Sequence, residues 1–216
     1  MHQFYYAPRA CSFAVHVVLE EIGAPYDARA RSIRDGQTAS ADYLALNPKG
    51  RVPALGGVAG SAGGAAGLLT EVGAILVFLA RSNPQVKLLP PDPAAEARCL
   101  EWLSWLSTDV HGIGFGQLWR PERFVADAAL HQAVMAKGME NIRAAYDHIE
   151  TILADGRAWA VPQQYTVVDP YLTVFWRWGE RIGLDMAAGW PLLSRLAAKV
   201  LARPAAVRAL AQEEGQ

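Results

Sequence analysis

The first residue in this chain that could carry chemistry is the cysteine at position 11. Cys11 follows Pro8-Arg9-Ala10, where an expected first strand turns into an expected first helix. A sulfur atom there lies near unpaired backbone N–H groups and the positive end of the helix. This position favours a thiolate, with a pKa below the ~8.5 of a free cysteine, or it stabilises the sulfur of a bound thiol. The structural alternative is a small buried residue at a helix start. Ala14, three residues on, excludes a C-x-x-C dithiol.

Two further positions could hold an extended ligand beside this sulfur. Val52-Pro53 begins a strand, which is where a cis proline is often placed. A cis bond leaves the Val52 backbone groups free to pair with an extended peptide, and a turn proline without a ligand is the alternative. Glu71 stands at the start of an expected helix. It either caps backbone donors there or binds a ligand ammonium group.

The histidines and the remaining motifs carry weaker signals. His111 lies among apolar residues of a long helical pattern, and such a histidine is more often a core residue than a catalyst. The other histidines lack H-x-x-x-H spacing, and the two cysteines lack metal-like spacing, so we expect no metal site. Thr166-Val167-Val168-Asp169 has the form of a capping box, which predicts a role in folding.

The elements that position these residues fall into two parts. Patterns in the first part predict strands near 3–6, 26–32, 52–55 and 67–69 and helices at 11–23, 40–46 and 72–82. Residues 56–67, reading GGVAGSAGGAAG, predict a mobile loop. The proline-rich segment 83–93 cannot continue a helix and predicts a linker. Beyond it, helical patterns at 94–117, 126–153, 167–182 and 191–201 indicate an all-α part.

Composition narrows the class of protein. The 216 residues carry a net charge of −1 and are 52% hydrophobic, an ordinary globular composition without the basic surface of a nucleic-acid-binding protein. The longest apolar stretch is about half of the ~20 residues that a bilayer span needs, and the N-terminus shows no secretion signal. We therefore expect a cytoplasmic protein with neither a nucleic-acid nor a membrane partner.

Taken together, these segments resemble the glutathione transferase superfamily, and most closely its bacterial beta class. The matching segments follow one another in the family's order and spacing over nearly the whole chain: Tyr5-Tyr6-Ala7-Pro8-Arg9-Ala10-Cys11-Ser12, residues 42–55, Leu69-Thr70-Glu71, Glu101-Trp102-Leu103, Asp109-Val110-His111, residues 166–172, Arg177-Trp178 and Arg203-Pro204-Ala205. The resemblance implies an α/β thioredoxin-like domain of residues 1–82 that binds glutathione, a linker of residues 83–93, an all-helical domain of residues 94–216, and a homodimer.

The resemblance also implies a role for each candidate residue. Cys11 and His111 face the glutathione sulfur from the two domains, and Val52, before Pro53, pairs with the cysteinyl part. The γ-glutamyl end lies against Glu71 and the backbone N–H of Val72, with Arg51 among the basic partners of the anionic peptide. The implied reaction is conjugation of the glutathione thiolate to small hydrophobic electrophiles, a detoxification reaction. Its apolar pocket has four candidates that equally fit a helical core: Phe115, Trp119, Phe175 and Trp178.

Three positions depart from the family pattern. Val72 replaces a small or hydroxyl residue, Ser104 replaces an asparagine, and Gly112 replaces a lysine. These departures leave two other functions open. One is a thiol oxidoreductase in which Cys11 forms a mixed disulfide with glutathione, and the other is a non-catalytic binding or regulatory protein on the same fold.

Overall fold

A four-stranded sheet organises the N-terminal part of the chain. The computed structural model describes residues 1–58 and 67–215. Its strands are β1 (His2–Tyr6), β2 (Tyr26–Ala30), β3 (Ala54–Gly56) and β4 (Leu69–Thr70), in the order β2-β1-β3-β4. The β1–β2 pair is parallel and the other two pairs are antiparallel. A parallel pair needs a crossover, and helix α1 (Ser12–Ile22) supplies it.

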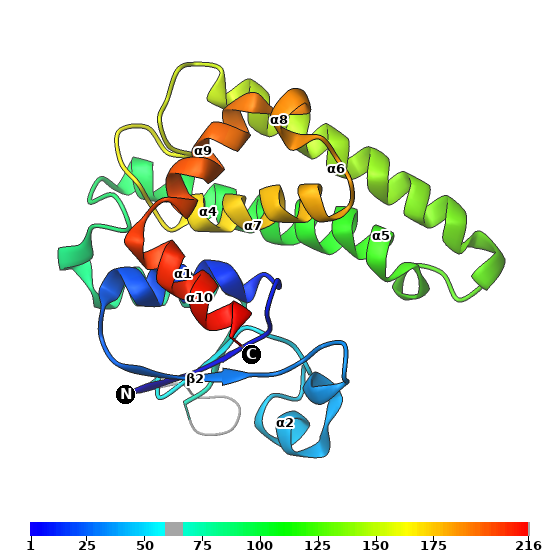
Figure 1. Ribbon diagram of the computed structural model, residues 1–216, viewed down its shortest axis with the longest axis horizontal. Helices are drawn as coiled ribbons and strands as arrows, with labels where there is room; N and C mark the ends of the chain where they lie inside the picture. The colour runs from blue at the N-terminus through cyan, green and yellow to red at the C-terminus, as the bar shows by residue number, and fades with distance from the viewer. Residues whose placement is uncertain (59–66, 216) are drawn as a thin grey trace.

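Helix α1 packs against elements of both halves of the chain. It ends where Gly23 takes the left-handed conformation, with φ of 70°, and its N–H donates to the Leu19 carbonyl oxygen. All of its residues from Ser12 to Leu19 are buried. Figure 1 shows why, because α1 lies between the sheet and the helical half of the chain. It packs against α3 (Val72–Ser82), α7 (Val168–Arg181) and α10 (Pro204–Glu214), while the short α2 (Ala41–Leu46) lies apart.

The helical half begins at Pro93, and its first helix is divided into three segments rather than one. The stretch expected as one helix is helical throughout, as α4 (Pro93–Trp105), a π-helix (Leu106–Phe115) and α5 (Gly116–Trp119). π-Helical turns are frequent at functional sites, and this longer π-helical stretch carries His111. The other helices are α6 (His131–Leu153), α8 (Met186–Gly189) and α9 (Pro191–Leu201), and short 3₁₀ turns occur at 37–39, 84–86, 121–123 and 128–130.

The sequence patterns missed α8 and α10. Helix α8 has only four residues, too few to show a periodicity. Helix α10 starts with Pro204 only three residues after α9 ends, and its richness in alanine leaves only a weak apolar periodicity beyond residue 201. The expected mobile loop lies largely at 59–66, outside the described residues. Its described ends pair, since the Val58 N–H donates to the Gly67 carbonyl oxygen at 2.9 Å.

The capping box fixes the start of α7. The Asp169 carboxylate accepts from the Thr166 N–H at 2.7 Å, and the Val168 N–H donates to the Thr166 hydroxyl at 3.3 Å. Asp169 also accepts from the Ala160 N–H at 2.8 Å, and its side chain is fully buried. Burial raises the pKa of this carboxyl group to about 6. The predicted folding motif is thus present, and it joins α7 to the preceding loop. None of the helices in the described residues is long and apolar enough to cross a membrane.

Candidate functional site

Cys11 lies at the turn between β1 and α1, as the sequence predicts, but its thiol is not activated. Its side chain is only 6% exposed, and Sγ donates to the Val52 carbonyl oxygen at 3.6 Å. Burial raises the pKa of the Cys11 thiol to about 12, outweighing the N–H groups of Cys11 and Ser12, which lower it. The prediction that the helix start favours a thiolate is therefore wrong, because desolvation dominates. At neutral pH Cys11 is a hydrogen-bond donor.

This protonated state predicts a slow reaction with alkylating agents. Since the thiolate is the reacting species, we expect iodoacetamide at pH 7.5 to modify Cys11 at least about 100-fold more slowly in the folded protein than in the urea-unfolded chain. Peptide mass spectrometry separates Cys11 from Cys99. Equal rates in the two states would contradict the protonated thiol.

The segment before Pro53 is held rigidly, and this fixes the backbone of Val52. The Arg51 carbonyl oxygen accepts from the Tyr43 hydroxyl at 2.7 Å and from the Asn47 amide at 2.8 Å. The Val52–Pro53 peptide bond is cis. Among the described residues the Val52 N–H has no backbone partner, and its carbonyl oxygen accepts only from the Cys11 thiol. An extended peptide can therefore pair with Val52 next to the sulfur of Cys11.

Glu71 has a strained backbone and an exposed carboxylate that is paired with Lys49. Its φ of 73° and ψ of 125° lie in a region that residues with a side chain rarely adopt. The carboxylate does not cap α3, which excludes a plain capping role. It accepts instead from the Lys49 ammonium group, with Oε1 2.6 Å from Nζ, and both side chains are exposed. The Val72 N–H opens α3 and belongs to its unpaired first turn. Glu71 thus presents a negative charge suited to an ammonium group, beside a backbone donor suited to a carboxylate.

His111 lies close to these groups and is uncharged. Burial, followed by the positive charges of Arg120 and Arg51, lowers the pKa of His111 to about 4. The charge of Glu71, in the first part of the chain, acts on both His111 and Cys11. Arg120 and Arg123, which the sequence reading missed, add positive charge here. Burial and then Arg120 and Arg51 lower the pKa of Arg123. The segment 120–123, which reads R-P-E-R, carries no motif that marks Arg120 and Arg123 as site residues. Only the fold brings their charges to act together with that of Arg51.

The four aromatic candidates form one cluster, although not all of them line a surface. Their ring centroids lie 4.8 Å apart for Phe115 and Trp119, and 4.9 Å apart for Trp119 and Trp178. Phe115 and Phe175 are 1% and 0% exposed, however. Phe115 and Phe175 therefore fill the helical core, which is the alternative that the sequence left open for them, and do not line a surface. Trp119 is 40% exposed, and Trp178 contacts His111 with ring centroids 4.9 Å apart.

The last helix holds the loop that carries Cys11. The Arg9 N–H donates to Glu213 Oε2 at 3.2 Å, and Glu213 Oε1 lies 3.4 Å from Nδ1 of the fully buried His16. From the other side, the Trp178 indole donates to the Arg9 carbonyl oxygen at 3.0 Å. Arg9 itself has φ of 62°, in the left-handed region. Helices α7 and α10 therefore set the conformation of the residues just before Cys11.

A small mixed sheet with a cis proline opposite a cysteine at a helix start, joined to a helical half, defines a two-part thioredoxin-like protein. Family models agree with this class. The model of the glutathione S-transferase N-terminal domain matches residues 9–82, and that of the C-terminal domain matches residues 122–204. The chain belongs to the glutathione S-transferase family.

Individual relatives support the same assignment. The chain is 31% identical to glutathione S-transferase GstA of Escherichia coli O157:H7, over 98% of each chain. A glutathione transferase homologue from Sulfitobacter, solved with bound glutathione, superposes with a TM-score of 0.88 at 28% identity, covering 100% of this chain and 98% of that one. A bacterial beta-class transferase from Sphingomonas chungbukensis superposes with a TM-score of 0.79 at 28% identity, over 98% of each chain.

Proposed function

We propose that this glutathione S-transferase conjugates the glutathione thiolate to small hydrophobic electrophiles. The observation that supports the proposal is the Cys11 thiol bonded to the Val52 backbone, with the charge of Glu71 acting on both Cys11 and the uncharged His111. Glutathione would lie along Val52 with its ammonium group at Glu71. Its C-terminal carboxylate would face the positive charges of Arg51, Arg120 and Arg123.

The protonation states of the site favour conjugation over disulfide chemistry. With glutathione bound, the Cys11 S–H would donate to the glutathione thiolate in place of the Val52 carbonyl oxygen, and neutral His111 would add a second polar contact to the same sulfur. The glutathione thiol loses its proton to solvent water. The thiolate then forms a bond to the electrophilic carbon, and the leaving group departs with the electron pair of the bond that breaks. A thiol oxidoreductase needs Cys11 itself as the attacking thiolate, and a pKa of about 12 opposes that.

The proposal extends to the assembly and to the division of the chain. By likeness to the family we propose a homodimer in the cytoplasm, with glutathione as co-substrate and no metal. We also propose that residues 83–93 link a glutathione-binding part, 1–82, to an electrophile-binding part, 94–216. Light scattering of the purified protein measures the oligomeric state.

The test measures binding and turnover separately. Calorimetry measures glutathione binding, and conjugation of 1-chloro-2,4-dinitrobenzene measures turnover. Both are carried out on the wild type, on Cys11→Ala and on Cys99→Ala. The last is the matched control, because Cys99 is also a buried thiol. We expect saturable binding with turnover, a loss of about tenfold in kcat for Cys11→Ala, as one hydrogen bond to a charged group predicts, and no loss for Cys99→Ala. Absence of binding at millimolar glutathione would leave the non-catalytic alternative.

A further inference from the structure

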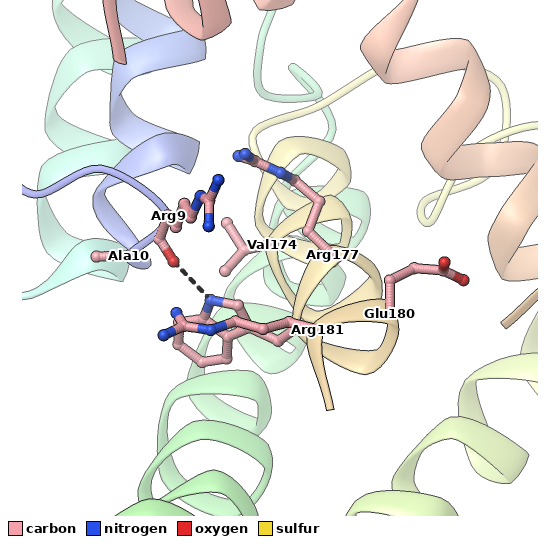
Figure 2. A pocket seen from close by; sticks show the side chains of 7 residues that line it. Arg9, Ala10, Val174, Arg177, Glu180 and Arg181 are labelled. Atoms are coloured by element: carbon pink, nitrogen blue, oxygen red, sulfur yellow. Dashed lines mark hydrogen bonds between the residues drawn. The ribbon is translucent and has the colours of Figure 1, made fainter. Parts of the chain in front are cut away.

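A cavity with positively charged walls lies beside the Cys11 loop, on the side of α7. Its volume is about 340 Å³, within the range of small-molecule sites. Figure 2 shows it between the loop at Arg9 and Ala10 and helix α7. Seven residues line it: Arg9, Ala10, Val174, Arg177, Trp178, Glu180 and Arg181. Three of the seven carry a guanidinium group, and none of the roles proposed above for glutathione uses them.

The three guanidinium groups have no anionic partner in the part of the chain that the structure describes. Arg9, Arg177 and Arg181 form no ion pair and no side-chain hydrogen bond there. Aromatic rings hold two of them in place. Arg177 lies over the ring of Phe13 at 4.3 Å, and Arg181 lies over the ring of Trp119 at 5.6 Å. Burial lowers the pKa of Arg177, and the charge of Arg9 lowers it further, so these two groups lie close together.

The nearby carboxylates do not neutralise this cluster. In Figure 2 the Glu180 side chain points away from the arginines, and its Oε1 accepts from the Met186 N–H at 3.3 Å. The Glu213 carboxylate is engaged by the Arg9 N–H and by His16. Burial lowers the pKa of Arg177, the charge of Glu213 raises it more than the charge of Arg9 lowers it, and Glu214 raises it as well. Neither Glu213 nor Glu214 lines the cavity, however, where three arginines face one glutamate. The cavity therefore keeps a net positive lining.

The rest of the lining is apolar. Val174 and the nine-tenths buried Trp178 also line the cavity, and Trp178 is fixed because its indole N–H donates to the Arg9 carbonyl oxygen. We propose that this cavity binds a small organic acid, whose carboxylate or sulfonate is held by Arg9, Arg177 and Arg181 while its apolar body lies on Val174 and Trp178. Planar guanidinium groups pair with two oxygens of such an anion at once.

This inference goes beyond conjugation of neutral electrophiles, since binding of the acid needs no turnover. The probes are 4-chloro-3-nitrobenzoate and its methyl ester, in which one added methyl group removes the negative charge. Calorimetry with the wild type is expected to show the acid binding at least about tenfold more tightly than the ester, as two or more charged hydrogen bonds predict.

Variants locate the site. Arg9→Gln together with Arg181→Gln is expected to weaken binding of the acid about tenfold or more and to leave binding of the ester and of glutathione unchanged. Arg177→Met provides a second variant, checked by thermal unfolding because Arg177 packs on Phe13. Arg195→Gln, an exposed guanidinium on α9, is the matched control. Equal affinity for acid and ester, or an unchanged affinity in all arginine variants, would overturn the proposal.

A conjugation assay with glutathione then shows whether the bound acid is a substrate, and either result supports the proposed binding site. If the acid is conjugated to glutathione with kcat/KM above that of the ester, and the arginine variants lose this preference, the cavity selects acidic electrophiles. If the bound acid is not conjugated, the cavity is a site for a non-substrate anion. Because the binding measurement omits glutathione, it holds even if the transferase activity proposed above is absent.

Discussion

Asp169→Ala is expected to lower the free energy of unfolding by about 3 kcal/mol. Its carboxylate is the acceptor for two backbone N–H groups, of Thr166 and Ala160, in a fully buried place. Alanine leaves both donors without a partner, and each unsatisfied buried group costs about 1–3 kcal/mol. The measurement is urea unfolding followed by circular dichroism.

The control for this variant is an exposed cap. Asp92 accepts from the Ala95 N–H at the start of α4, so Asp92→Ala removes a similar hydrogen bond that water can replace and costs about 1 kcal/mol. Equal losses for the two variants would show that burial of the Asp169 network contributes nothing.

The same carboxyl group predicts a pH dependence. With a pKa of about 6 in the folded protein against 3.8 in the unfolded chain, the folded state binds the proton more tightly. The free energy of unfolding therefore falls as the pH rises from about 4 to about 6, relative to an Asp169→Asn variant that cannot titrate. A difference between the two proteins that stays constant over this interval would contradict the raised pKa.

Glu71→Gln is expected to weaken glutathione binding between about tenfold and a hundredfold. The substitution keeps the size of the side chain and removes the charge that would face the γ-glutamyl ammonium group. A hydrogen bond to a charged group contributes about 1.5–3 kcal/mol, and each 1.4 kcal/mol is about tenfold in affinity. Calorimetry measures the dissociation constant directly.

Two further variants separate binding from folding. Glu140→Gln removes the carboxylate of a comparable exposed pair with Lys137 on α6 and should leave glutathione affinity unchanged. Glu71→Gly also removes the charge, and it relieves a backbone strain of about 1–3 kcal/mol at φ of 73°. We expect it to bind glutathione weakly while unfolding at a urea concentration no lower than that of the wild type. Wild-type affinity in Glu71→Gln would contradict the role of the charge.

Most helices and strands could be located from the sequence, because the signals that start and end them come from neighbouring residues. Gly23 ends α1, and Pro84 and Asn83 follow the end of α3, as glycine and proline preferences predict. The capping box needed only the spacing of Thr166 and Asp169. The family resemblance implied that Cys11 and Val52 contact the same part of glutathione, but the direct Cys11–Val52 hydrogen bond, between residues 41 positions apart, has no signal in a single sequence.

What the sequence did not show depends on burial and on distant charges. The pKa of Cys11 is set by how completely the sulfur is covered, and a helix start alone suggested the opposite direction. The left-handed φ of Glu71 cannot be read from a glutamate, which normally avoids that region. The two arginine clusters, around Arg120 and around Arg177, each combine residues from different parts of the chain, so no sequence window contains them.

The position of α10 decides how the chain can be recombined with its relatives. Helix α10 comes last in sequence, yet it packs against α1 in the first part, with Arg203 paired to Glu21, Arg208 paired to Glu20 and Gln212 bonded to His16. A chimera that joins residues 1–82 of this protein to the helical half of a relative would keep the peptide linker and lose these contacts. Grafting α10 together with the N-terminal part preserves them. For exchange between family members, the interchangeable unit is therefore discontinuous in sequence.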